Sequence, residues 1–219
     1  MNMTPLIILH QINTITELNM TMPKYGVEVD IRHDNRTGRL YLNHDPGTGD
    51  DFEDYLKKFS EQGNKFIIFN IKEAGIEERV VGLASKYNVE DYFLLDVEFP
   101  FIFKAASEGK HSSDTFFGLN GRIAIRYSEA EPLANALQFK GIFKWAWTDT
   151  ITRLPLDARI YEQLIGARYK IALVSPERWG RPDDLSAYMT YMKNEGIKLD
   201  AVMTDIKYAG QWENSGVLK

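Results

Sequence analysis

The chain contains no cysteine among its 219 residues. This absence excludes a disulfide framework, a thiolate zinc site, an iron–sulfur cluster and a cysteine nucleophile. It does not indicate the cellular compartment, because a chain without cysteine can fold under oxidising or reducing conditions. Glycine and proline, at 16 and 8 residues, are also too few for a collagen-like or disordered chain.

Long apolar runs and an excess of positive charge are missing as well. No stretch approaches the roughly 18 apolar residues of a membrane span, and no targeting segment is evident around the apolar run 6–9. We therefore expect a soluble, cytoplasmic protein without membrane insertion. The net charge of −5 argues against broad nucleic-acid binding but allows a small anionic substrate. The oligomeric state cannot be derived from the sequence.

Strand-like and helix-like segments alternate along the whole chain. The predicted strands are 5–9, 27–32, 66–71, 92–95, 122–126, 142–146, 170–174 and 201–204. The predicted helices are 13–22, 52–59, 75–87, 99–108, 129–138, 156–168 and 183–195. This alternation implies parallel strands joined by right-handed crossovers. Eight strands in about 200 residues suit a single α/β domain over residues 1–219, a (β/α)₈ TIM barrel; a doubly wound open sheet is the alternative.

One segment departs from this alternation. Residues 33–45 follow the second predicted strand and contain the turn formers Asn, Asp, Thr and Gly. They predict a small β-hairpin inserted after that strand. Because long excursions on the top face of a barrel usually carry function, His44 and Asp45 become candidate functional residues.

Polar side chains gather at the ends of the predicted strands. Strand alternation places Glu28, Asp30 and Arg32 on one face of the second strand, and Asn70 and Lys72 together at the end of the third. Buried charges are unfavourable unless they pair or bind a metal. The two carboxylates suit one divalent cation with oxygen ligands, Mg²⁺ or Ca²⁺.

The same charges also have a purely structural interpretation. The carboxylates can pair with Arg32, Lys72 or Arg126 in an internal salt-bridge network. His10, at the end of the first predicted strand, is compatible with a structural hydrogen bond, and His44 with an exposed turn position. Trp145 fits core packing, with an apolar wall for a substrate as the alternative.

Four motifs occur in order within the first 72 residues. They are His10, Glu28-Val29-Asp30, His44-Asp45 and Asn70-Ile71-Lys72. In type and spacing they resemble the glycerophosphodiester phosphodiesterase family, and more broadly the phospholipase-C-like phosphodiesterase superfamily. The resemblance extends over the whole barrel, and it implies a site at the carboxyl ends of the strands and a role in lipid metabolism.

The resemblance assigns a role to each matching residue. It implies that His10 and His44 are the general acid–base pair, that Glu28 and Asp30 bind the metal, and that Lys72 contacts the phosphate. A cation to neutralise the nonbridging oxygens and two groups to move protons are what phosphodiester cleavage needs. We therefore expect a metal-dependent hydrolase of a small phosphodiester, with a glycerophosphodiester as the lead candidate.

The chain also departs from the family pattern. Gln11 follows His10 where Arg-Gly is common, so a phosphate-binding cation is missing; Arg32 and Arg126 are candidates to replace it. Asn70 stands where an acidic third metal ligand is expected, which leaves an amide oxygen and one negative charge fewer. The short segment 46–65 leaves little room for the insertion that usually encloses the glycerol end.

These departures keep two other functions open. One is a weakened or non-catalytic barrel, derived from such an enzyme, that binds phosphate or sugar; retention of both histidines argues against it. The other is a barrel lyase or isomerase that uses Lys72 as a Schiff-base amine.

Overall fold

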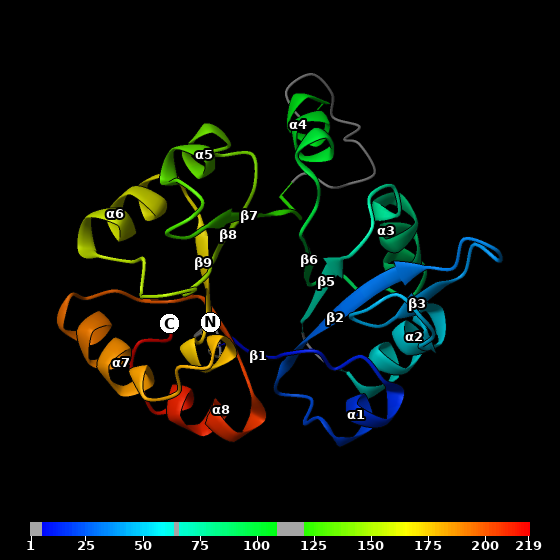
Figure 1. Cartoon of the computed structure of the whole chain (residues 1–219), viewed down its shortest axis with the longest axis horizontal. Helices are drawn as coiled ribbons and strands as arrows, with labels where there is room; N and C mark the ends of the chain where they lie inside the picture. Colours follow the sequence, from blue (N-terminus) through cyan, green and yellow to red (C-terminus); the bar gives the residue numbers. More distant parts are fainter. Residues whose placement is uncertain (1–5, 64–65, 109–120) are drawn as a thin grey trace. The chain divides into compact units, whose positions relative to one another are not determined.

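A computed structural model describes residues 6–63, 66–108 and 121–219 (Figure 1). Helices and strands alternate along the chain, and most of the paired strands run parallel, so the protein belongs to the α/β class. The chain divides into two compact units, one formed by residues 10–123 and the other by residues 1–9 and 124–219.

The unit of residues 1–9 and 124–219 contains five parallel strands in the order β1-β10-β9-β8-β7. Their bounds are β1 Leu6–Leu9, β7 Ala124–Tyr127, β8 Trp145–Thr148, β9 Lys170–Val174 and β10 Ala201–Thr204. The intervening helices are α5 Leu133–Gln138, α6 Ala158–Gly166, the 3₁₀ helix η2 Pro176–Trp179, α7 Asp184–Asn194 and α8 Ile206–Glu213. Its core includes the fully buried Ile171, Leu173 and Trp212.

The unit of residues 10–123 places β2 parallel to β5, and β5 parallel to β6. The strands are β2 Gly26–His33, β3 Leu40–Leu42, β4 Asp50–Asp51, β5 Ile67–Ile71 and β6 Tyr92–Leu95. The helices are α1 Ile15–Met20, α2 Phe52–Gln62, α3 Glu77–Lys86 and α4 Phe99–Glu108. This unit holds most of the residues that the sequence assigns to a site.

The two faces of the β2–β5 pair differ in chemistry. Phe69 of β5 contacts Phe52 of α2 edge-to-face, with ring centroids 5.5 Å apart, so α2 covers this face. Val29 of β2 is the register partner of Phe69 and shares its face. Asp30 and Asn70 are likewise register partners, and alternation turns them to the opposite face. An apolar layer on one side thus brings polar side chains together on the other.

The predicted hairpin after the second strand is confirmed. β3 pairs antiparallel with β2, and Arg32 lies opposite Tyr41. A further short strand, β4, pairs with β3 and was not predicted. Gly49, just before β4, lies so close to Leu42 that a Cβ there would come within 1.9 Å of the Leu42 carbonyl oxygen. The β3–β4 turn therefore requires glycine at this position.

Several predicted elements differ from the structure at their ends. The predicted strand 142–146 is misplaced, because a turn after α5 continues to Phe143 and β8 begins only at Trp145. The predicted helix 129–138 begins at Leu133, since the Ser128 hydroxyl accepts hydrogen bonds from the backbone N–H groups of 130 and 131 and forms a turn there. Helix α8 was not predicted.

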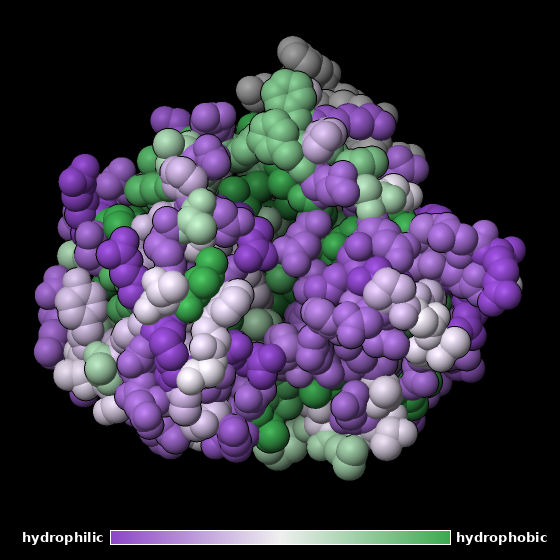
Figure 2. Space-filling view, in the orientation of Figure 1, coloured by the Kyte–Doolittle hydropathy of each residue, from purple (hydrophilic) through white to green (hydrophobic). Residues whose placement is uncertain are grey.

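The surface carries one exposed aromatic pair. Phe99 and Phe103 of α4 are 63% and 60% exposed, and the surface at the position of α4 is pale green in Figure 2. Their rings lie 6.4 Å apart. Among the described helices, none is long and apolar enough to cross a membrane.

Candidate functional site

Four polar side chains form a strand-end cluster: Glu28 and Asp30 within β2, Asn70 near the end of β5, and Lys72 directly after β5. The Asn70 amide nitrogen Nδ2 donates a hydrogen bond of 2.9 Å to Glu28 Oε1. Lys72 Nζ lies 3.1 Å from Asp30 Oδ1. Glu28 and Asp30 are 1% and 0% exposed. The sequence prediction that these residues share one face is confirmed by these contacts.

Three residues of the segment that precedes α1 contact this cluster. The Gln11 backbone N–H, held by a left-handed backbone with φ of 52°, donates to Glu28 Oε2 at 2.8 Å. Asn13 binds Asp30 twice at 2.8 Å: its Nδ2 donates to Asp30 Oδ2, and its Oδ1 accepts from the Asp30 backbone N–H. His10 Nε2 lies 4.0 Å from Glu28 Oε2. The predicted catalytic His10 thus lies beside the predicted metal ligands.

Asn13 had no assigned role in the sequence. The available signal is its position three residues after His10, in the segment that follows the first predicted strand. Thr14 has a separate role, since it caps α1 in a capping box with Glu17. Asn13 therefore orients Asp30 through its two hydrogen bonds.

The burial of two carboxylates perturbs their protonation. Desolvation is the largest effect and raises the pKa of Glu28, and the negative charge of Asp30 raises it further. Hydrogen bonds from Asn70 and Gln11 and the charge of Lys72 lower it in part, and the net result is a pKa of about 7. One ammonium group therefore does not fully compensate two buried carboxylates.

Two oxygens of the strand-end cluster lack hydrogen-bond donors. Asp30 Oδ1 and Asn70 Oδ1 are buried and accept no hydrogen bond, although Lys72 Nζ forms an ion pair with the former. Carboxylate and amide oxygens are suitable ligands for Mg²⁺ or Ca²⁺. Across the described ranges, no group of three or more His, Asp or Glu side chains is arranged to hold a metal. A cation here would thus depend on two carboxylates and the Asn70 amide.

His44, the second predicted catalytic histidine, ends the hairpin. Its side chain is 55% exposed, and its Nδ1 lies 3.0 Å from Asp45 Oδ1. Its carbonyl oxygen accepts hydrogen bonds from Arg32 Nε and Nη2, at 3.0 and 2.8 Å. Arg32 Nη1 also donates to Glu73 Oε1 at 3.0 Å, and Glu73 contacts the His33 ring. Arg32 therefore anchors the hairpin end, and its contact with a substrate stays a prediction.

Glu73 is a residue that the sequence interpretation missed. Its position directly after Lys72, at the end of a predicted strand, is the available signal. Hydrogen bonds from Arg32 and His33 lower the pKa of its carboxyl group overall, although burial by itself acts in the opposite direction. Glu73 thus remains a carboxylate that holds Arg32 beside His44.

Arg126 and Trp145, the other predicted substrate contacts, belong to the unit of residues 1–9 and 124–219. Arg126 pairs with Asp149 and with Glu131, whose Oε1 is 2.8 Å from Arg126 Nε. Trp145 is 6% exposed, and the Lys170 ammonium lies 5.3 Å from its ring centroid. Their contacts with a substrate stay predictions.

This unit also holds a buried carboxylate of its own, in a Glu177 cluster that comprises Ser175, Glu177, Thr204 and Trp212. Thr204 Oγ1 donates to Glu177 Oε1 at 2.5 Å, and the Ser175 hydroxyl donates to Glu177 Oε2. The Asp205 backbone N–H adds a 3.2 Å bond to Oε1, and Trp212 Nε1 donates to Ser175 Oγ at 2.9 Å. Glu177 has no role predicted from the sequence, and the structure places it in this hydrogen-bonded cluster.

The comparisons with known proteins bear on the fold. No protein-family model matches the chain, and no curated protein matches its sequence. A solved structure described as "Structural study of Project ID from Aquifex aeolicus VF5" is similar, with a TM-score of 0.52 and 10% sequence identity. The match covers 97% of this chain and 88% of that one. The similarity is one of fold.

Proposed function

We propose that the chain is a (β/α)₈ barrel similar to the glycerophosphodiester phosphodiesterases, and that it hydrolyses a small phosphodiester at the strand-end cluster. The main support is the buried Asn70 Oδ1, which accepts no hydrogen bond and belongs to the same cluster as the Glu28 carboxyl and Asp30 Oδ1, whose one partner is the Lys72 ammonium. Buried polar atoms normally have partners, so oxygens left without one favour a ligand that supplies them. A divalent cation has the chemistry to do so.

The residues of the cluster would have two roles, metal binding and phosphate binding. Glu28, Asp30 and Asn70 would hold Mg²⁺ or Ca²⁺, which when bound supplies a Lewis acid for the nonbridging phosphate oxygens. Lys72 lies on the same edge and offers a fixed positive charge to the phosphate. Because Glu28 must lose its proton to become a ligand, we expect metal affinity to increase as the pH rises through about 7.

The two histidines would move the protons. Asp45 accepts a hydrogen bond from His44 Nδ1–H when that nitrogen carries the proton. His44 Nε2 is then free to act as the base that takes a proton from the attacking water. His10, whose Nε2 lies 4.0 Å from Glu28 Oε2, would protonate the departing alkoxide. The phosphorus–oxygen bond to the alcohol breaks as the bond to the attacking oxygen forms, and one proton passes to His44 while another leaves His10.

The test is hydrolysis of glycerophosphodiesters, bis(p-nitrophenyl) phosphate and a lysophospholipid, each with Mg²⁺, with Ca²⁺ and with EDTA. We expect metal-dependent release of product that EDTA abolishes. His10→Ala and His44→Ala should each lower turnover by about a hundredfold or more while the chain stays folded. His111→Ala is the matched control, because this histidine is assigned no role in catalysis and His33 contacts the Glu73 that holds Arg32 beside His44. Full activity in either of the first two variants would contradict the two-histidine mechanism.

A second candidate function is a barrel that binds phosphate without cleaving it. The ion pair of Lys72 with Asp30 supports it, because the ammonium group already compensates a carboxylate that a metal would otherwise neutralise. The amide at Asn70 supports it too, since it lowers the negative charge available to a cation. Folded protein that binds the metal and the diesters but is silent in every assay would favour this candidate over the hydrolase.

A further inference from the structure

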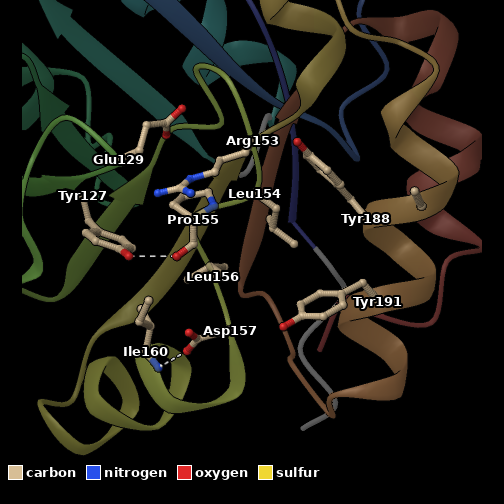
Figure 3. A pocket seen from close by; sticks show the side chains of 11 residues that line it. Tyr127, Glu129, Arg153, Leu154, Pro155, Leu156, Asp157, Ile160, Tyr188 and Tyr191 are labelled. Atoms are coloured by element: carbon tan, nitrogen blue, oxygen red, sulfur yellow. Dashed lines mark hydrogen bonds between the residues drawn. The ribbon is translucent and has the colours of Figure 1, made fainter.

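A cavity of about 550 Å³ lies within the unit of residues 1–9 and 124–219 (Figure 3). Tyr127 at the end of β7, the segment 153–157 that precedes α6, and Tyr188 and Tyr191 of α7 form its walls. The volume falls in the range of about 300–1,000 Å³ that is typical of small-molecule sites. The cavity uses none of the residues of the strand-end cluster.

Arg153 is the cation of this cavity. Its guanidinium group extends toward Glu129 and Tyr127 (Figure 3). The two neighbouring carboxylates are used locally: Asp157 caps α6 through the Ile160 N–H at 2.7 Å, and Glu129 Oε1 accepts from the Thr152 hydroxyl at 2.7 Å. No hydrogen bond or ion pair of the Arg153 side chain is found among the described residues, so its fork of donors is available to an anion.

Glu129 offers a hydrogen-bond acceptor in the same cavity. Its second oxygen, Oε2, is buried and accepts no hydrogen bond. Burial acts to raise the pKa of Glu129, but the hydrogen bonds from Thr152 and from the backbone outweigh it and lower the pKa, so the group is a carboxylate. A buried carboxylate oxygen without a donor is unfavourable, and a ligand hydroxyl would satisfy it.

The tyrosines give the cavity its flat apolar walls. The Tyr127 hydroxyl donates to the Pro155 carbonyl at 2.8 Å, and the Tyr188 hydroxyl accepts from Arg181 Nη1 at 2.7 Å. These bonds fix the rings, so their faces rather than their hydroxyls are presented to a ligand. Tyr191 adds a third ring and is 40% exposed. Aromatic faces of this kind suit the C–H face of a sugar ring.

We propose that this cavity binds a sugar with an anionic group, either a phosphate or a carboxylate. Arg153 takes the anion, a sugar hydroxyl donates to Glu129 Oε2, and the ring lies against the tyrosines. An uncharged sugar would leave Arg153 unused. A purely aromatic anion would leave Glu129 Oε2 without a donor.

The test follows the backbone amide resonances of the ¹⁵N-labelled full chain during titration with glucose 6-phosphate, glucuronate, glucose and inorganic phosphate. We expect saturable shifts in residues 127–129, 153–160 and 187–191 with at least one of the two anionic sugars, and binding at least about tenfold weaker for glucose and for phosphate alone. Binding of glucose 6-phosphate only would identify phosphate as the anion, and binding of glucuronate only would identify the carboxylate.

Arg153→Gln should weaken this binding at least about tenfold, because it removes the charge and keeps a polar side chain. Arg159→Gln is the matched control, since Arg159 lies on α6 outside the cavity lining and is exposed. The absence of saturable shifts with both anionic sugars, or equal binding by Arg153→Gln, would overturn the proposal. Shifts confined to residues 10–72 would also overturn it, because they would place the binding at the strand-end cluster; loss of hydrolysis has no bearing on this result.

Discussion

Two buried carboxylate sites of this chain, the Glu177 cluster and the strand-end cluster, differ in how completely their carboxylate oxygens are hydrogen-bonded. In the Glu177 cluster, the carboxylate receives hydrogen bonds from two hydroxyls and a backbone N–H, and its neighbour Ser175 is in turn bonded by Trp212. In the strand-end cluster, two carboxylates share one ammonium group, and Asp30 Oδ1 accepts no hydrogen bond. The first site is satisfied from within the protein, and the second is not.

This difference separates a structural carboxylate from one that is available to a ligand. A buried carboxylate that accepts three hydrogen bonds, as Glu177 does, stabilises the local packing and has little acceptor capacity left for a ligand. An incompletely satisfied pair keeps an electrostatic cost that a cation would relieve, and the raised pKa of Glu28 reflects that cost. Burial alone does not distinguish the two sites; the number of donors does.

The largest expected effect comes from Glu177→Ala. The change leaves the Thr204 hydroxyl and the Asp205 N–H without their acceptor in a buried site, so we expect a loss of about 3 kcal/mol in the free energy of unfolding. Urea denaturation at pH 7 measures it. Glu177→Gln keeps one acceptor oxygen and should lose less. A loss below about 1 kcal/mol for the alanine variant would show that the cluster is not the structural site described above.

Glu28→Gln should increase the free energy of unfolding, and the size of this increase should depend on pH. Because the folded pKa of Glu28, about 7, lies above the ordinary glutamate value of 4.5, the folded state holds a proton that the unfolded state releases between these pH values. The wild-type protein therefore loses stability as the pH rises from about 4.5 to about 7, and the glutamine variant does not. We expect similar stabilities near pH 4.5 and an advantage for the variant on the order of 1–3 kcal/mol at pH 8.

The measurement is denaturant unfolding at a series of pH values in EDTA, and again with Mg²⁺ or Ca²⁺. A bound cation should stabilise the wild-type chain at pH 8 and stabilise Glu28→Gln much less. A pH-independent difference between the two proteins would contradict the raised pKa. Equal stabilisation of both by the metal would place the cation elsewhere.

The smallest expected effect is that of Asn70→Asp on the affinity for a divalent cation. A third carboxylate should increase affinity for Mg²⁺ or Ca²⁺ by about tenfold, which corresponds to ~1.4 kcal/mol. Calorimetric titration at pH 8 measures the affinity. Asn135→Asp, at an exposed position on α5, is the matched control because it changes the net charge by the same amount. Equal affinities for the two variants would show that the Asn70 side chain is not a ligand.

Much of the strand-end cluster was predictable because it depends on local periodicity. Alternation along 27–32 and 66–71 predicted that Glu28, Asp30, Asn70 and Lys72 share a face, and their contacts confirm it. The partners contributed by loops were not predictable in this way. Asn13 and Glu73 lie outside the strands, where no periodicity determines the direction of a side chain.

The bounds of the helices and strands were also only partly predictable from the sequence. The strands 92–95, 170–174 and 201–204 and the helix 99–108 were predicted with their observed bounds, since each is a distinct run of apolar or amphipathic sequence. The β8 strand was misplaced because the apolar residues 142 and 143 fit a strand as well as the turn that they form. Helix α8 was missed altogether, and its Trp212 is fully buried.

The sequence by itself determined the α/β alternation, the hairpin after β2 and the shared face of the strand-end cluster, because all three follow from the spacing of apolar, polar and turn-forming residues along the chain. The tertiary structure decided which buried carboxylate is satisfied. Hydrogen-bond donors reach Glu177 from residues 27 and 28 positions away, whereas Asp30 Oδ1 receives none. Such saturation depends on distances between segments remote in sequence, and no local pattern encodes those distances.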